Sequence, residues 1–286
     1  MPTLKLSEIL LPVDFSDKGK LATHYATALA RHFDATLTLL HVNEVYSPAL
    51  VAPRELYGPI DTGWISALEA ERLKELHTYQ EGDLQDLKVQ RVVVSGDPAQ
   101  RITDHARKEK TSLIVMPTHG YGPFRRFLLG SVTAKVLHDV ACPVWTGAHL
   151  SEAPRHGGQE VPVENLLCAI DNGPASERVL TWARDFASEF GARITVVHAA
   201  HVLGRRTEEA SEQIRCLLKK LGVRGEIEIV VDDGDSDTGK SVAAVAAKLN
   251  ADVVVIGRSP DATGLGRLRA NAYAIIRQSP CPVISV

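Results

Sequence analysis

Residues 113–133 read LIVMPTHGYGPFRRFLLGSVT and join a predicted strand to a predicted helix through two corners that contain glycine. The strand covers residues 113–116, and the helix begins at Ser131. Gly120 lets the backbone approach a ligand closely. The first turn of a helix offers free N–H groups and the positive end of the helix dipole. The stretch therefore predicts a corner that suits a phosphate group.

Length and composition predict a cytoplasmic protein of two domains. The chain has 286 residues, of which 44% are hydrophobic, which is enough for two ordinary cores. It contains no apolar stretch of about 18 residues, as a membrane span requires, and its first residues carry no signal-peptide pattern. The net charge is only −3 and no basic block stands out, so neither nucleic acid nor a membrane is an expected partner.

The chain repeats itself. ILLPVD at 9–14 returns as LLCAID at 166–171, and TLLHV at 38–42 returns as TVVHA at 195–199, both with an offset of 157 (171 minus 14; 198 minus 41). Near each end, ACPV at 141–144 returns as PCPV at 280–283 with an offset of 139 (281 minus 142). The first copy is therefore longer by about 18 residues, which we place in the Pro- and Gly-rich residues 46–63.

Apolar runs and helical patterns alternate within each copy. In the first copy we predict strands at 9–13, 36–42, 89–94, 113–116 and 144–145, and helices at 20–32, 66–80, 100–108 and from 131 onward. Strands that are apolar at nearly every position are buried on both faces, and the helices between them act as right-handed crossovers. The sequence thus predicts an α/β fold of two tandem, doubly wound, five-stranded parallel sheets of Rossmann type. The predicted domains are 1–148 and 163–286, with a linker at 149–162.

Ligands of such sheets bind beyond the carboxyl ends of the strands, where the strand order reverses. If the first and fourth strands are neighbours, Asp14, Val42 and Gly120 converge on one crevice. The Asp14 carboxylate can accept hydrogen bonds from ribose hydroxyls, and the backbone at Val42 can pair with an adenine edge. Asp14 has an alternative role as the cap of a helix that begins near Ser16.

Both copies resemble universal stress protein domains, and the whole chain resembles a tandem member of that family. Its nucleotide-binding members carry Gly-x2-Gly-x9-Gly-Ser/Thr, which Gly120, Gly130 and Ser131 match, while Pro117 replaces the first glycine and removes one N–H donor. The resemblance implies a fold like that of the adenine nucleotide alpha hydrolases and an ATP cofactor. Mg or Mn could accompany the phosphates, without a dedicated set of protein ligands. Carried over by position, the implied ATP site consists of Pro12, Val13, Asp14, Val42, Met116, His119, Gly120, Gly130, Ser131, Val132 and Thr133.

The second copy has lost part of this pattern. Asp171 remains and Gly257 stands where the first copy has Pro117, but Pro260 replaces the second motif glycine and Arg269-Ala270 replaces Gly130-Ser131. We therefore predict a second domain that is degenerate for ATP. Its arginines, Arg258, Arg267 and Arg269, could attract another anion, but a solvated basic rim is the favoured interpretation.

Residues 234–241, GDSDTGKS, satisfy the phosphate-loop pattern between a predicted strand at 226–231 and a predicted helix at 241–249. Four acidic residues crowd this loop and would repel a polyphosphate. The strand at 252–256 is followed by no acidic residue that could hold magnesium. The repeat also aligns the loop with the ordinary turn at 95–98. We interpret the match as fortuitous.

Histidines and cysteines offer competing sites. His41 and His198 recur at strand ends and are interpreted as satisfied histidines of the core or rim. The four cysteines lie far apart in apolar or helical runs, which predicts reduced core thiols without disulfides or a metal site. The repeated Cys-Pro-Val segments are interpreted as edge strands that pair the two domains within one chain, and a homodimer of two such chains remains open.

Together with these observations, the resemblance implies an ATP-binding stress-response protein that senses or signals through nucleotide occupancy of its first domain. Two alternatives stay open. One is a slow ATPase or phosphotransferase that uses the first crevice or the Gly234 loop. The other is a scaffold that binds no nucleotide. The sequence shows no convincing general base near the first crevice, which favours holding ATP over hydrolysing it.

Overall fold

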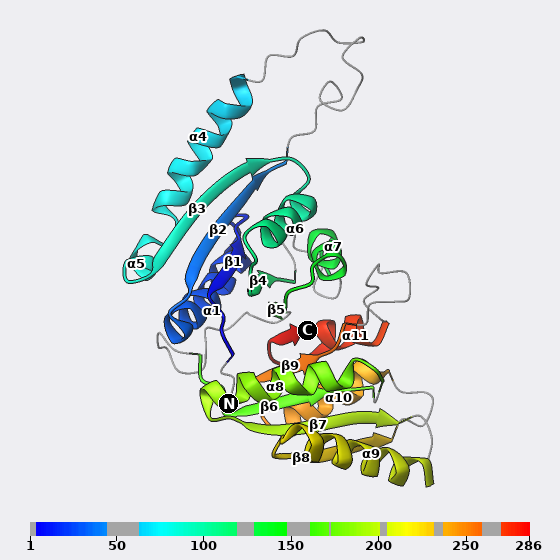
Figure 1. Ribbon diagram of the computed structural model, residues 1–286. Coiled ribbons are helices and arrows are strands. Elements are labelled where there is room, and N and C mark those ends of the chain that lie inside the picture. The colour runs from blue at the N-terminus through cyan, green and yellow to red at the C-terminus, as the bar shows by residue number, and fades with distance from the viewer. Residues whose placement is uncertain are drawn as a thin grey trace, which may run out of the picture.

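Short apolar runs form one continuous sheet of ten strands (Figure 1). The computed structural model describes residues 4–44, 63–118, 129–147, 161–171, 173–200, 205–231, 237–258 and 270–286. The strand order is β3-β2-β1-β4-β5-β10-β9-β6-β7-β8. The strands are β1 (Glu8–Pro12), β2 (Thr36–Asn43), β3 (Lys88–Ser95), β4 (Leu113–Pro117), β5 (Val144–Gly147), β6 (Asn165–Ala169), β7 (Arg193–Ala200), β8 (Gly225–Val231), β9 (Val253–Ile256) and β10 (Val283–Ser285).

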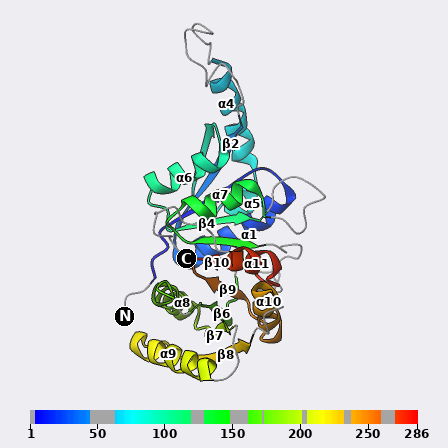
Figure 2. The ribbon, with the colours of Figure 1, turned by 90° about the vertical axis from the view of Figure 1, so that its right-hand side faces the viewer.

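Helices cover both faces of the sheet. They are α1 (Asp17–Phe33), α4 (Gly63–Thr78), α5 (Glu81–Leu84), α6 (Pro98–Lys108), α7 (Ser131–Asp139), α8 (Ser176–Phe190), α9 (Arg205–Leu221), α10 (Thr238–Lys248) and α11 (Ala270–Gln278). One face packs against α1, α4, α5, α8 and α9, and the other against α6, α7, α10 and α11. Figure 2 shows this for the second half, where α8 and α9 lie on one side of the strands and α10 and α11 on the other. The predicted doubly wound α/β fold, present twice, is confirmed.

The two halves join through their last strands. β5 and β10 pair antiparallel, with Trp145 opposite Ile284 and Val144 opposite Ser285. All the other neighbouring strands run parallel. The pairing supplies hydrogen-bond partners to two edges that would otherwise be open. The predicted pairing of the two Cys-Pro-Val segments within one chain is therefore confirmed, and the C-terminus lies between the halves (Figure 1).

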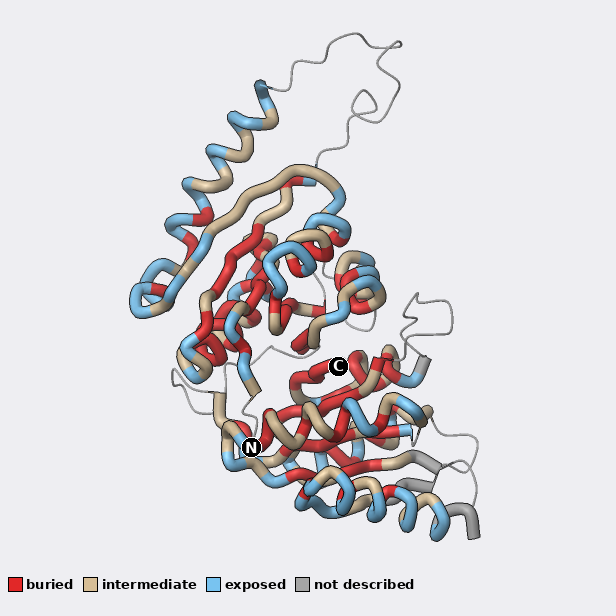
Figure 3. The backbone as a smooth tube through the Cα atoms, in the orientation of Figure 1, coloured by how far each residue is buried: buried red, intermediate tan, exposed pale blue. Residues whose placement is uncertain are grey.

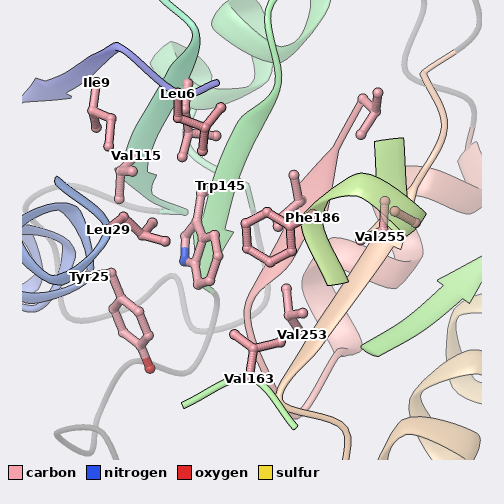
Figure 4. Packing of buried hydrophobic residues seen from close by; sticks show 14 of the residues in the cluster. Leu6, Ile9, Tyr25, Leu29, Val115, Trp145, Val163, Phe186, Val253 and Val255 are labelled. Carbon is pink, nitrogen blue, oxygen red and sulfur yellow. The ribbon is translucent and has the colours of Figure 1, made fainter. Parts of the chain in front are cut away.

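A continuous core runs through this junction. Trp145 of β5 is 1% exposed, and its ring centroid lies 5.6 Å from that of Tyr25 on α1 and 6.3 Å from that of Phe186 on α8. Figure 4 shows the indole between side chains of the first half and of the second. Buried residues concentrate on the central strands, whereas α4 is mostly exposed (Figure 3). The halves thus share apolar burial in addition to backbone pairing.

Several helix boundaries differ from the predicted ones because capping residues set them. The helix predicted at 241–249 begins at Thr238, since the Asp237 carboxylate accepts a hydrogen bond from Gly239 N–H and caps it. Asp97 caps α6 in the same way through Gln100 N–H. The helix predicted at 66–80 ends at Thr78, and a short helix, α5, follows it that the sequence analysis missed.

The structure confirms the predicted chemistry for three of the four thiols. None of the four cysteines forms a disulfide. Burial raises the pKa of Cys168 to about 12 and that of Cys142 to about 11, so both remain protonated at neutral pH. Cys281 is partly buried. The prediction of a core thiol is wrong for Cys216, because this residue lies on an exposed face of α9.

Two predicted segments lie largely outside the described residues. These are the insertion at 46–63 and the linker at 149–162, so the predicted domain boundaries remain predictions. Within the described part of the chain, no helix combines the length and apolar character that a membrane crossing requires.

Candidate functional site

The strand order of the first half reverses between β1 and β4. β1 pairs with β2 on one side and with β4 on the other, all parallel, with Leu10 opposite both Thr38 and Ile114. The first and fourth strands, β1 and β4, are therefore neighbours, as the convergence of Asp14, Val42 and Gly120 on one crevice requires. Their carboxyl ends, together with the end of β2, define the place where doubly wound sheets bind ligands.

Helix α7 begins against the end of β4. Its N-cap residue is Gly130, whose N–H donates to the Thr118 carbonyl at 2.8 Å, and the Thr133 hydroxyl donates to the Pro117 carbonyl at 3.0 Å. These two bonds hold the first turn of the helix at the switch point. Ser131 is exposed there, and Val132 is partly exposed.

The start of α7 differs from the starts of three other helices. Ser16, Asp97 and Asp237 each use a side-chain oxygen to bind a backbone N–H of the first turn. Among the described residues, no side chain caps α7 and no acidic residue occupies its first turn. The backbone N–H groups of its first three residues have no acceptor within the helix. An anion would complete this end and meet the positive end of the helix dipole.

Asp14 follows β1 and supports the cap of α1 without being the cap itself. One oxygen of its carboxylate accepts hydrogen bonds from Ser16 N–H at 3.0 Å and from the Ser16 hydroxyl at 2.6 Å. Ser16 in turn caps the helix through Gly19 N–H at 3.1 Å. The capping alternative for Asp14 therefore holds only indirectly, and the ribose role remains a prediction.

The residue after Asp14 has an unusual backbone conformation that the sequence analysis missed. Phe15 has φ 60°, a region that bulky residues rarely adopt. Its ring lies 4.7 Å from that of His41 and 5.6 Å from that of Tyr79, centroid to centroid. Burial and, to a smaller degree, the charge of Asp14 raise the pKa of Tyr79. Strained residues of this kind cluster at binding sites because the surrounding packing maintains them.

The two repeated histidines are satisfied by backbone, as predicted. His41 Nδ1 lies 2.7 Å from the Val13 carbonyl, and His198 Nδ1 lies 3.0 Å from the Ile170 carbonyl. A carbonyl only accepts, so Nδ1 carries the proton in both rings. Each histidine ties its strand to the end of the neighbouring strand.

The other predicted site residues lie as follows. Pro12 ends β1, Val13 is buried beyond it, Val42 lies near the end of β2, and Met116 is buried near the end of β4. Gly130, Ser131, Val132 and Thr133 form the N-cap and first turn of α7. His119 and Gly120 lie outside the described residues. The structure thus brings the described members to the ends of β1, β2 and β4 and to the start of α7.

Arg258 corrects a prediction about the second half. The sequence favours a solvated rim for this arginine, but Arg258 is 8% exposed. Its guanidinium donates to the carbonyls of Leu137, Val140 and Cys142 at 3.0, 2.8 and 2.5 Å. Leu137 lies in the last turn of α7, Val140 is its C-cap, and Cys142 follows in the turn before β5. A cation is favoured at the end of a helix by the helix dipole. Burial lowers the pKa of Arg258 to about 10, so the group stays charged at neutral pH. Arg267 and Arg269 lie outside the described residues.

The phosphate-loop motif has a structural explanation where it is described. The Asp237 carboxylate accepts a hydrogen bond from Gly239 N–H at 2.9 Å and another from Gln278 Nε2 at 2.6 Å, so this N–H group is not available to a phosphate. A Cβ on Gly239 would lie 2.7 Å from the backbone carbon of Ala274, so this glycine allows α10 to pack closely against α11. A carboxylate at the helix start excludes a second anion by repulsion.

Replacement of Lys240 with alanine is therefore expected to leave nucleotide affinity within about twofold of the parent, a difference of ~0.4 kcal/mol. Isothermal titration with ATP measures this. A loss of tenfold or more would restore the motif as a nucleotide site and support the phosphotransferase alternative.

Among the described ranges of the chain, no group of three or more His, Cys, Asp or Glu residues is placed to hold a metal ion.

Comparisons with known proteins agree with this architecture. The model of the Universal stress protein family matches residues 6–146 and 162–286. A universal stress protein of Methanocaldococcus jannaschii is 33% identical over 137 residues, covering 48% of this chain and 79% of that protein. One of Mycolicibacterium smegmatis is 28% identical over 225 residues, covering 73% and 71%.

Solved structures show the same fold over the whole length. A universal stress protein from Archaeoglobus fulgidus superposes with a TM-score of 0.69 at 20% identity, covering 99% of this chain and 97% of that one. A putative universal stress protein from Pseudomonas aeruginosa gives 0.66 at 19% identity, covering 98% and 93%. The two matched segments and the full-length superpositions lead to one conclusion: the chain belongs to the universal stress protein family and carries two of its domains in tandem.

Proposed function

We propose that the first half binds ATP at the β1/β4 switch point and that the protein senses or signals through occupancy of this site. The observation that carries the proposal is the start of α7. It lies against the end of β4, it has no side-chain cap and no first-turn acid among the described residues, and an anion would complete it. Gly130 and Ser131 stand at this helix start, and together with Gly120 they match the sequence motif of nucleotide-binding members of the family.

The residues fit the parts of ATP. Backbone at Val42 would pair with the adenine edge, and Val13 and Met116 would border the base at the strand ends. Asp14 has a carboxylate oxygen that its bonds to Ser16 do not use. The loop from His119 to Thr133 would hold the phosphates, and Pro12 would bound the crevice. Bound ATP would supply the negative charge that α7 lacks, and Mg or Mn could accompany it through the phosphates.

Binding without rapid hydrolysis is the proposed activity, because the sequence offers no convincing general base beside the phosphate corner. The second half, with Arg269-Ala270 in place of the glycine and serine, would serve as a structural partner.

Two measurements test this function. Mass spectrometry of the small molecules released on denaturing the dialysed protein should find adenine nucleotide at close to one per chain. Replacement of Asp14 with alanine should then weaken ATP binding by about tenfold or more, since a lost hydrogen bond to a charged group costs ~1.5–3 kcal/mol. The matched control is Asp171→Ala, the counterpart in the second half, which should leave affinity unchanged.

Three outcomes would contradict the proposal. An empty protein whose melting temperature does not respond to millimolar ATP would favour the nucleotide-independent scaffold. Equal losses in Asp14→Ala and Asp171→Ala would place the site elsewhere. Steady phosphate release that Asp14→Ala abolishes would establish the slow ATPase.

A further inference from the structure

The first half does not hold helix α7 alone. Leu129, the residue before the N-cap, donates its backbone N–H to the hydroxyl of Tyr273 on α11 of the second half, at 3.1 Å. The Leu129 side chain is buried at 8% exposure in a cluster that includes residues of both halves. The next residue, Gly130, gives its N–H to the Thr118 carbonyl. The Leu129 amide is thus hydrogen-bonded to the second half, and the Gly130 amide to the first half. Both precede the N–H groups of α7 that have no acceptor within the helix.

The far end of α7 is tied to the second half as well. Arg258, directly after Gly257 beyond the end of β9, donates to the Leu137 and Val140 carbonyls at the end of α7 and to the Cys142 carbonyl in the turn that follows. Its own backbone is fixed, because its N–H donates to the Val286 carbonyl at 2.8 Å and its carbonyl accepts from Arg178 at 2.7 Å. A helix of nine residues therefore has one anchor in the second half at each end.

The matching positions of the first half carry residues of other types than the two anchors, Tyr273 and Arg258. The pairing of β5 with β10 relates Trp145 to Ile284, an offset of 139 (284 minus 145), which places Ala134 at the position of Tyr273. Met116 pairs with Thr146 of β5, and Ile256 pairs with Ser285 of β10, which is the counterpart of Thr146 at the same offset of 139 (285 minus 146). Met116 therefore corresponds to Ile256, and Thr118, two residues later, corresponds to Arg258. Alanine has no hydroxyl, and the Thr118 hydroxyl donates to Gly147 of its own half. The two halves are therefore specialised differently at this contact.

We propose that Tyr273 is a positioning residue of the nucleotide site: from the second half, it fixes the entrance of α7 so that the N–H groups of Ser131, Val132 and Thr133 converge on the phosphates. This inference rests on the proposed ATP site and assigns the second half a part in it. Tyr273 touches no ligand itself. It acts through the Leu129 amide, while Arg258 holds the other end of the helix.

The test is Tyr273→Phe in the full chain, which removes the hydroxyl and keeps the ring. ATP affinity is expected to fall about three- to tenfold, the range for one hydrogen bond. Adenosine, which lacks phosphates, should bind Tyr273→Phe and the parent equally in competition measurements. Hydrogen exchange at the Leu129 amide should accelerate in the variant. A matched control is Tyr25→Phe, which removes a tyrosine hydroxyl on the opposite face of the sheet and should change neither affinity.

The outcomes separate the two proposals. A parent that binds ATP while Tyr273→Phe binds it equally well overturns the positioning role and leaves the ATP site standing. Equal losses for ATP and adenosine also overturn it, because they indicate a general structural effect. A parent that binds no adenine nucleotide overturns the ATP site and the positioning role together.

Discussion

Replacement of Gly130 with valine is expected to abolish measurable ATP binding, with a loss of at least about a hundredfold, ~2.8 kcal/mol, while the fold survives. The backbone at Gly130 has φ −61° and ψ 146°, a conformation that any residue adopts, so the chain conformation does not require glycine. In the proposed site, close approach of the phosphates would account for the missing side chain. Two methyl groups at this N-cap would stand in front of the N–H groups that the proposed site uses for phosphate.

Isothermal titration with ATP measures the predicted loss of binding, and a thermal melt measures whether the fold survives. The matched control is Gly82→Val, because Gly82 of α5 has open space around its Cβ position. That variant should retain parental affinity. Unchanged affinity in Gly130→Val would remove the phosphate site from the start of α7, and a collapsed melting temperature would show that Gly130 serves the fold.

Replacement of Trp145 with alanine is expected to destabilise the protein by about 3–5 kcal/mol, the range for truncating a large buried aromatic side chain. The indole is 1% exposed at the centre of the ten-stranded sheet and packs between Tyr25 and Phe186. Truncation would leave a cavity that both halves line, so both halves should lose stability. Denaturant unfolding measures the loss, and hydrogen exchange in β1 and β6 locates it.

Trp64→Ala provides the control, since this tryptophan of α4 is 47% exposed and its loss should cost less than about 0.5 kcal/mol. Trp145→Phe should recover most of the stability, because the indole N–H is buried without a partner among the described residues. A Trp145→Ala variant as stable as Trp64→Ala, or one that weakens only β1, would show that the halves do not share a core.

Local patterns explain why much of the fold could be predicted. Residues 9–13 and 113–116 are apolar at nearly every position because the strands they form, β1 and β4, are buried on both faces. The Cys-Pro-Val repeat similarly predicted the two strands that join the halves. Hydrophobic periodicity and the internal repeat can be seen in the sequence itself. They determine which segments become strands and helices and how the halves pair.

The sequence failed where a residue's role depends on a distant partner. Arg258 looked like a solvated arginine, but its acceptors lie more than a hundred positions earlier in the chain, at the end of α7. Gly239 looked like part of a phosphate loop, but it serves the contact of α10 with Ala274. The φ of 60° at Phe15 had no signal in its own residue type and depends on packing with His41 and Tyr79.

The sequence by itself therefore determined the α/β class, the tandem repeat, the family and the candidate residues at the strand ends. Only the tertiary structure decided that β1 and β4 are neighbours, that α7 starts without a cap among the described residues, and that Tyr273 and Arg258 reach it from the other half. The physical reason is that hydrophobic periodicity acts over a few residues, whereas hydrogen bonds and packing across the sheet depend on which segments the fold brings together.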